Sequence, residues 1–542
     1  MSAIAEITKP KKGSAFQEKL RDDTGASPIR WRYVPHDQLH LALDPWSGEP
    51  AEQTGLVLIE SIKRGRSRPY HKQKLAFVLA NLRSFVLEAQ AAGHPVLHLT
   101  TKGNFAEALS SLSHLGPLHV LRPAERELRL ELSPMLEAGS LIEQPHPGWL
   151  TPREWFLDEV GAEPPFRMSP LYKRFRRESG ALMDGDAPEG GKFSFDAENR
   201  QPWKGTPSAP AAPRFERTEV DLEVEALVEE VFTEHPGQVD LGALPTTRAQ
   251  ALEALRLVGS VLGPFGPFED AMSSKSRGLF HSRMASALNI HRVLPRELLE
   301  LVLESEAPLN SREGFVRQLI WREYVHHVHE VTDGFRSLTL ERAPTARRDA
   351  GWFGEGGASY TEDKELHPNR LQQLRELPRA YWEADSGLEC LDATVRSVME
   401  EGWTHHIPRL MVLGNIASLL DVEPRQLTDW FHAAFVDAYD WVVEPNVLGM
   451  GTFAVGEAMM TKPYVSGTPY IKKMSDHCED CELDPKSTCP LSKLYWAFLA
   501  RHQDAFEGNH RMSMPLRSMQ KRGEEQRSAD AAAFEEWSSK LA

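Results

Sequence analysis

The sequence predicts an α/β unit followed by a larger all-helical unit. In the first part of the chain, short apolar runs alternate with helix-length amphipathic segments, a pattern typical of a parallel sheet covered by helices. After Val220 nearly every segment has the hydrophobic period of an α-helix. The length agrees with more than one unit, because the chain has 542 residues and single hydrophobic cores stop growing near about 250–300 residues.

The elements of the first unit follow in order. The apolar runs at 30–34, 56–60 and 95–99 predict strands, and the stretches 72–92 and 104–114 predict helices. Strands separated by helix-length segments form right-handed βαβ units with a parallel sheet. The sequence therefore predicts a Rossmann-like α/β domain.

Composition predicts the segments around this domain. The start of the chain lacks the apolar core of a signal peptide, and we expect a disordered arm there. From Asp184 to Arg214 the chain is rich in glycine, proline and charge, which cannot bury much apolar surface. The predicted organisation is an arm (1–28), the α/β domain (29–150), a linker with short helices (151–219) and the helical domain (220–542).

Charge and hydropathy restrict the function classes. The formal net charge of −16 argues against a general polyanion binder, although DNA binding needs only a local basic face. We find no apolar stretch long enough to span a bilayer. We expect a cytoplasmic monomer that does not contact membranes.

The cysteines indicate a soft-metal site. The chain has four, and three of them lie in the run CEDCELDPKSTCP at 478–490. Thiolates select zinc or iron–sulfur clusters, and this spacing serves either. In the alternative interpretation Cys390 is a buried small hydrophobe and only the CxxC pair binds anything.

The helical part contains three further motifs. FVRQLIWREYV at 315–325 mixes a large aromatic with hydrogen-bonding groups on one helix, and it could equally be a core helix. FHSRMASALNI at 280–290 resembles a helix entry suited to a diphosphate. GWTHHIPRLMV at 402–412 places two histidines about one turn before Arg409, where an imidazole could act as a general acid or could simply be structural.

Six ordered blocks resemble those of one family. They are FHSRMASALN, FVRQLIWREY, GWTHHIPRLMVLGN, WFHAAFVDAYDWVVEPNVLGM, TKPYVSGTPYIKKMSDHCEDC and CPLSKLYWAF. The chain resembles the iron–sulfur bacterial cryptochromes and photolyases, also called prokaryotic (6-4) photolyases, from about Ile29 to beyond Arg511. The resemblance implies an α/β antenna domain, a long linker and a helical domain that holds a U-shaped FAD.

The resemblance also assigns cofactor residues. It implies a [4Fe–4S] cluster bound by Cys390, Cys478, Cys481 and Cys489, although relatives usually have a longer loop before the last ligand than the seven residues found here. It implies flavin contacts from side chains on several segments of the helical domain. These are His281, Ser282, Met284, Asn289, Gln318, Arg322, Arg409 and Asp437.

For activity, the resemblance implies light-driven repair of UV-damaged DNA. Photoexcited FADH⁻ would give an electron to a (6-4) photoproduct flipped out of the duplex, because the flavin cannot reach a bond inside the stack. Trp321 matches the residue that packs against the lesion, and His405 and His406 match the repair-site histidines, with His406 as the proton donor. Tyr464 and Tyr470 match active-site tyrosines.

Electron transfer and antenna residues show departures from the family. Trp382 and Trp430 match electron-transfer tryptophans, whereas Phe431 stands where at least one relative has a tyrosine.

In the antenna domain, relatives have GDQL and bind a ribityllumazine, whereas this chain has HDQL at 36–39. If a lumazine binds, we expect Asp37 and Gln38 to contact it.

Two other functions compete with repair. A cryptochrome-type blue-light photoreceptor would keep FAD and the tryptophans while losing repair, and retention of both histidines and Trp321 argues against it. A structural iron–sulfur DNA-binding module would lack flavin. The net negative charge of the chain also favours a divalent cation such as Mg²⁺, which could bridge carboxylates and DNA phosphates.

Overall fold

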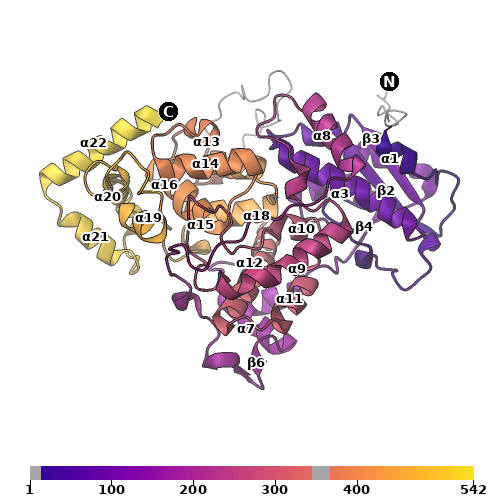
Figure 1. The fold of residues 1–542 in the computed structure, drawn as a ribbon, viewed down its shortest axis with the longest axis horizontal. Coiled ribbons are helices and arrows are strands. Elements are labelled where there is room, and N and C mark those ends of the chain that lie inside the picture. The colour runs from indigo at the N-terminus through magenta and orange to yellow at the C-terminus, as the bar shows by residue number, and fades with distance from the viewer. Residues whose placement is uncertain (1–13, 345–365, 542) are drawn as a thin grey trace.

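The computed structural model describes residues 14–344 and 366–541, with the α/β unit beside the helical unit (Figure 1). The first unit contains a five-stranded parallel sheet in the order β3-β2-β1-β4-β5. The strands are β1 (Arg30–Tyr33), β2 (Thr54–Ser61), β3 (Val96–Thr101), β4 (Leu118–Leu121) and β5 (Leu141–Gln144). The predicted α/β class is confirmed, and β4 and β5 add strands that the apolar runs did not indicate.

The strand order creates a switch point at the middle of the sheet. The chain runs outward from β1 to β2 and β3, and then returns to the other side of β1 with β4 and β5. Open α/β sheets bind ligands at such a point, beyond the carboxyl ends of the strands. The helices of this unit are α2 (Ile62–Gly65), α3 (Lys72–Ala91), α4 (Phe105–Ser110) and α5 (Arg126–Glu137).

The N-terminal arm differs from the expectation of disorder. Residues 1–13 of the predicted arm lie outside the described residues, but helix α1 (Ala15–Lys19) is ordered. Phe16 is fully buried, and its backbone N–H donates to Glu223 Oε2 at 3.1 Å. An aromatic anchor in a polar segment therefore fixes this part of the arm, which composition alone did not reveal.

Helix α8 (Glu219–Val231) belongs with the first unit, although the predicted boundary at 220 assigned it to the helical domain. It packs along α3 and α1. Arg83 of α3 donates to Glu223 at 2.7 Å, and Val224 and Val228 are fully buried in the same hydrophobic cluster as α3. The boundary was wrong because a helical period does not reveal which unit a helix packs against.

The predicted linker runs from the first unit onto the helical unit. It contains α6 (Arg153–Glu159), α7 (Met168–Ser179) and a hairpin of β6 (Met183–Asp184) and β7 (Ala187–Pro188). Its later part is held by side chains of α12: the backbone N–H of Phe195 donates to Glu313 Oε2 at 2.9 Å. The linker thereby brings Asp196 and Asn199 to the helical unit.

Helix α12 contributes to two apolar clusters of the helical unit, one through Phe315, Val316, Leu319 and Ile320 and the other through Tyr324, Val325 and Val328, and a third large cluster surrounds Trp430. The structure departs from the all-helical prediction only by the short pair β8 (Arg342–Pro344) and β9 (Leu366–Pro368) among the described residues. The helices are α9 (Arg248–Phe265), α10 (Ala285–Asn289), α11 (Pro295–Glu304), α12 (Leu309–Val331), α13 (Ala380–Glu383), α14 (Glu389–Glu401), α15 (His406–Pro408), η8 (Arg409–Gly414), α16 (Asn415–Leu419), α17 (Pro424–Ala434), α18 (Asp440–Val443), η9 (Glu444–Gly451), α19 (Thr468–Met474), α20 (Leu491–Arg501), α21 (Ser513–Gln520) and α22 (Glu524–Leu541).

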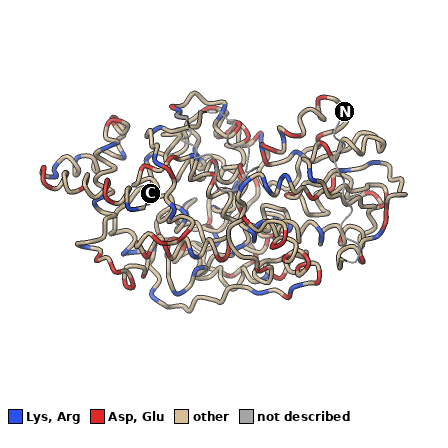
Figure 2. The backbone as a smooth tube through the Cα atoms, turned by 90° about the horizontal axis from the view of Figure 1, so that it is seen from above, with Lys and Arg blue, Asp and Glu red and all other residues tan. Residues whose placement is uncertain are grey.

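Charge is spread over the whole molecule. Figure 2 shows Lys and Arg intermixed with Asp and Glu along both units. Within the described part of the chain, no helix combines the length and the apolar composition needed to cross a bilayer.

Candidate functional site

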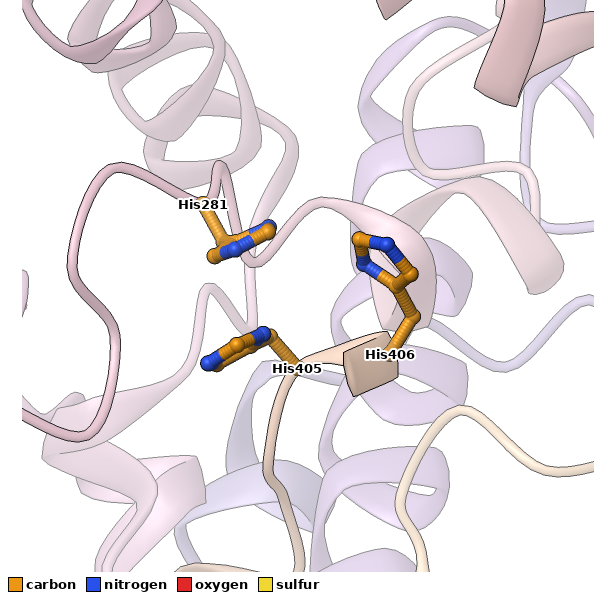
Figure 3. A group of neighbouring side chains, drawn as sticks. All are labelled: His281, His405 and His406. Carbon is orange, nitrogen blue, oxygen red and sulfur yellow. The ribbon is translucent and has the colours of Figure 1, made fainter. Parts of the chain in front are cut away.

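Three histidines from two distant segments meet in the helical unit (Figure 3). His281 lies in the loop before α10, and His405 and His406 stand at the start of α15. The His281 ring stacks on His405 with 4.0 Å between centroids and 13° between planes, and lies edge-on to His406 at 5.3 Å. The two sequence motifs that contained these residues therefore form one site.

The stacking makes this cluster a poor metal site. Lone pairs of imidazole nitrogens lie in the plane of the ring, so two nearly parallel rings 4.0 Å apart cannot both point at one ion about 2 Å away. The arrangement suits hydrogen bonding and proton transfer instead. Nε2 of His281 and Nδ1 of His405 are buried without a hydrogen-bond partner among the described residues, as expected for groups that face a ligand.

Burial keeps these imidazoles neutral. It lowers the pKa of His406 to about 4, against the raising effect of Glu269. It lowers the pKa of His281 and of His405 further, with the other histidines of the cluster and nearby arginines as the next causes. Protonation of the cluster near neutral pH therefore requires an added negative charge beside it.

Acidic and aromatic residues border this cluster. Gln318 Nε2 on α12 donates to Glu269 Oε1 at 2.6 Å, and Trp321 Nε1, one turn later, donates to Asn446 Oδ1 at 2.9 Å. Burial raises the pKa of Tyr464 and Tyr470, and Asp270 adds to both shifts. Gln318, predicted as a flavin contact, therefore shares Glu269 with His406, and the predicted active-site residue Tyr464 shares the influence of Asp196 with it.

Four of the predicted flavin contacts form one hydrogen-bonded network. Arg409 donates through both terminal nitrogens to Asp437, at 2.9 Å each. Asn289 Nδ2 donates to the Asp437 carbonyl at 2.8 Å, and Asn289 Oδ1 accepts from Arg322 Nε at 2.8 Å. Four separate segments are therefore joined around a common centre.

The other predicted flavin contacts lie close to this network in the sequence. Ser282 Oγ accepts from the Met284 N–H at 3.4 Å in the turn that leads into α10. Arg322 differs from the expectation of a direct contact: its guanidinium lies over Trp149 at 4.6 Å and over Trp441 at 5.1 Å. Since its nitrogens bond to protein atoms, Arg322 orients Asn289.

The predicted electron-transfer tryptophans are neighbours. The Trp382 and Trp430 rings lie 6.2 Å apart at 79°. Trp430 is fully buried, and its Nε1 has no hydrogen-bond partner in the described residues. Phe431 lies edge-on to Trp430 at 5.2 Å.

The four cysteines come together between α14 and the loop before α20. Cys390 is buried near the start of α14, and burial followed by the charges of the other three raises its pKa. The four thiols therefore offer a complete set of soft ligands, which either a cluster or a zinc ion could use.

A pocket of about 90 Å³ lies at the switch point of the sheet, between the two units. Its walls include His36, Glu60, Arg64 and Tyr70 of the first unit. His432 and Tyr439 of the helical unit close it, together with Phe232. Asp37 and Gln38, predicted as antenna contacts, are buried and directly follow His36 in the sequence. Both form hydrogen bonds with protein atoms: the Asp37 carbonyl lies 2.6 Å from His291 Nδ1, and Gln38 Nε2 donates to the Leu121 carbonyl at 3.1 Å.

Lys74 is a cavity residue that the sequence analysis missed. Its ammonium donates to the carbonyls of His432 and Ala438, at 2.8 and 2.6 Å, and burial lowers its pKa to about 7. A lysine on the apolar side of an amphipathic helix was the available signal. Its partners come from the other unit, so no local sequence pattern reveals them.

Comparisons with known proteins agree with this geometry. A family model for "Deoxyribodipyrimidine photo-lyase-related protein" matches residues 32–242, and one for "FAD binding domain of DNA photolyase" matches residues 315–479. A "(6-4) photolyase" of Agrobacterium fabrum is 31% identical over 522 residues, which cover 92% of this chain and 97% of that protein. The chain belongs to the cryptochrome/photolyase family.

Two solved structures of this family have the same fold. A bacterial class III photolyase from Agrobacterium tumefaciens aligns with a TM-score of 0.52 and 15% identity, covering 95% of this chain and 98% of that one. A Synechocystis cryptochrome aligns with a TM-score of 0.52 and 12% identity, covering 94% and 99%. The photolyase fold predicted from the six blocks is confirmed.

The segment matched by the flavin-binding model contains four of the predicted flavin contacts, Gln318, Arg322, Arg409 and Asp437. The buried nitrogens His281 Nε2 and His405 Nδ1 have no hydrogen-bond partner among the described residues. These residues fit a flavin. The match over 32–242 includes α8, in agreement with its packing on α3.

Proposed function

We propose that this protein is a (6-4) photolyase, which uses blue light to restore (6-4) pyrimidine–pyrimidone photoproducts in UV-damaged DNA as a monomer. The observation that carries the proposal is the cluster of His281, His405 and His406 beside the lesion residues on α12. Repair of a cyclobutane dimer needs no proton donor, whereas return of the (6-4) hydroxyl to its original base does. Similarity over nearly the full length to a (6-4) photolyase supports the same reaction.

The residues divide the work between binding and proton transfer. Trp321 offers a flat surface on which a flipped dinucleotide stacks, with its indole held by Asn446. Gln318 and the tyrosines Tyr464 and Tyr470 border the same space and donate hydrogen bonds to the bases. His406 gives its proton to the lesion, and the stacked pair of His281 and His405 holds it in place.

Proton uptake accompanies substrate binding. Burial lowers the pKa of His406 to about 4 in the DNA-free protein, so that the imidazole is mainly neutral at pH 7. The phosphates of a bound lesion place negative charge near the ring and raise this pKa. The acid is therefore formed only when there is something to protonate.

The network of Asn289, Arg409 and Asp437 would hold FAD, whose chemistry there would be the transfer of one electron to the lesion from its reduced, light-excited state. Trp430 and Trp382 conduct electrons to the flavin pocket when the cofactor must be reduced again. Cys390, Cys478, Cys481 and Cys489 would hold a [4Fe–4S] cluster; the proposal is supported by the electrostatic interaction of Cys390 with the other three sulfurs.

An antenna chromophore of the ribityllumazine type would bind at the pocket between the units. The cavity is lined by rings, with charged groups at Glu60, Arg64 and Lys74 for the polar part of such a ligand. Mg²⁺ at the carboxylates Asp196, Glu269 and Asp270 would allow DNA phosphates to approach this acidic edge.

The proposal is tested with a (6-4)-containing oligonucleotide under blue light. The wild-type protein with reduced FAD should restore the bases, as measured by chromatography. His406→Ala should bind the same DNA within about threefold and lose at least 100-fold in repair, the usual scale for removing a general acid. His510→Ala, at an exposed histidine, is the matched control and should repair normally.

A blue-light photoreceptor is the alternative, and the fold shared with a cryptochrome is compatible with it. Wild-type protein that photoreduces its flavin but leaves the (6-4) lesion intact would contradict the proposed repair function and favour the photoreceptor.

A further inference from the structure

Two consecutive residues of α13 flank the buried tryptophan of the relay. Tyr381 lies edge-on to Trp430, with 5.3 Å between ring centroids and 90° between planes, and Trp382 lies 6.2 Å from the same ring. Tyr381 is fully buried, whereas Trp382 is partly exposed. Of these two neighbours of Trp430, Trp382 therefore lies toward the solvent and Tyr381 lies in the core.

Tyr381 leads toward the cysteine site. Helix α13 packs against α14, which carries Cys390, and both residues belong to one buried apolar cluster. Tyr381 therefore lies on the helix that contacts both Trp430 and the helix carrying Cys390.

We propose that Tyr381 is the electronic bridge between the iron–sulfur site and Trp430, and that the cluster thereby serves as an internal electron donor to the flavin relay. The inference rests on the proposed cofactors, and it assigns to the cysteine site a role in photoreduction. After Trp430 has given an electron to the photoexcited flavin, an electron from the cluster passes through the Tyr381 ring and fills the hole on Trp430.

The proposed electron transfer conserves electrons and forms or breaks no bond. The flavin gains one electron, the cluster loses one, and Trp430 returns to its initial state. No proton moves, because the Tyr381 hydroxyl donates to the Leu413 carbonyl at 2.7 Å, and a carbonyl oxygen is too weak a base to accept that proton. Tyr381 therefore conducts by tunnelling and does not become a tyrosyl radical. Its aromatic ring is needed and its hydroxyl is not.

The hydroxyl and the ring can be tested separately. Anaerobic holoprotein with oxidised FAD is frozen under blue light, and electron paramagnetic resonance measures the oxidised cluster, which is paramagnetic. In a Trp382→Phe background, which closes the outward route, the cluster signal should persist. Adding Tyr381→Phe should keep it within about twofold, whereas adding Tyr381→Leu should lower it at least tenfold. Phe431→Leu, which removes another edge-on neighbour of Trp430, is the matched control and should not change the signal.

A further variant tests the same electron path even if Tyr381→Leu does not fold. Trp430→Phe should abolish the light-induced cluster signal, since it removes the acceptor of the electron. Three results would each overturn the inference. The first is a cluster signal that survives Trp430→Phe, and the second is an unchanged signal in Tyr381→Leu. The third is a wild-type protein that contains both cofactors but shows no light-induced cluster signal.

Repair by chemically reduced enzyme separates this inference from the proposed function. With the flavin already reduced, Tyr381→Leu should repair (6-4) DNA at the wild-type rate, because the relay is not needed. Wild-type protein that oxidises its cluster in light but repairs no (6-4) lesion would contradict the repair function and leave the Tyr381 bridge intact.

Discussion

At the scale of single residues, Asp437 connects the proposed flavin contacts through both its side chain and its backbone. The carboxylate accepts two bonds from Arg409, and the carbonyl accepts one from Asn289. Arg409 also lies over Phe435 at 4.2 Å, so its guanidinium cannot easily turn away to find another partner. The position of Arg409 therefore depends on the negative charge of Asp437.

We expect Asp437→Asn to weaken FAD binding at least tenfold. The amide presents a donor to one arm of Arg409, and the arginine loses its counter-charge at a nearly buried site. Flavin absorbance after gel filtration, and titration of apoprotein with FAD, measure the effect. Asp429→Asn is the control, since Asp429 pairs with Arg425 on α17 outside this network; equal flavin loss in both variants would contradict the prediction.

At the scale of elements, His71 joins the two units through the start of α3. Its Nδ1 accepts from the Gln73 N–H at 3.0 Å and caps the helix, and its Nε2 donates to the Met399 carbonyl of α14 at 2.9 Å. Both bonds require the neutral ring with the proton on Nε2. Protonation at Nδ1 would break the cap.

This histidine should make stability depend on pH. Burial lowers the pKa of His71 to about 4 in the folded protein, while the unfolded value is about 6.5. The unfolded chain therefore takes up the proton first, and the stabilisation present above pH 6.5 is lost as the pH falls toward 4. At pH 5 the loss amounts to about 2 kcal/mol.

The measurement compares denaturant unfolding at pH 7.5 and pH 5. His71→Asn keeps a side chain that can cap a helix but does not titrate, so the difference in free energy of unfolding between the two pH values should shrink by about 2 kcal/mol. The control His510→Asn changes an exposed histidine and should leave the difference as it is. An unchanged difference in His71→Asn would refute the assignment.

Elements were more predictable than their partners. The runs at 30–34 and 56–60 became β1 and β2 because alternation and burial act locally. The place of α8 was not predictable, since its apolar face could cover either unit. The histidine cluster was found because two motifs each held a piece of it, whereas Lys74 and Tyr381 act through partners far away in the sequence, which no local pattern reveals.

At the scale of the whole molecule, the acidic balance matters most where DNA must approach. The net charge is −16, and Asp196, Glu269 and Asp270 stand near the lesion residues. Burial and the neighbouring Glu269 raise the pKa of Asp270 to about 7. This edge therefore becomes more negative as the pH rises through 7.

We expect Mg²⁺ to tighten binding of lesion DNA several-fold relative to EDTA at the same ionic strength. The effect should grow between pH 6.5 and 8, because Asp270 is then deprotonated and can share the ion with phosphate. Fluorescence anisotropy with a labelled oligonucleotide measures it. Asp270→Asn should reduce the dependence on Mg²⁺, and identical dissociation constants with Mg²⁺ and with EDTA would contradict the prediction.

The pocket between the units limits which segments can be exchanged between this protein and its relatives in a chimaera. Its floor is built by the α/β unit, but His432 and Tyr439 close it from the helical unit, and Lys74 reaches across to the carbonyls of His432 and Ala438. A chimaera that exchanges only residues 1–242 would join half of one binding site to half of another. Transfer of a light-harvesting function between such proteins would require the segment from His432 to Tyr439 to travel with the donor domain.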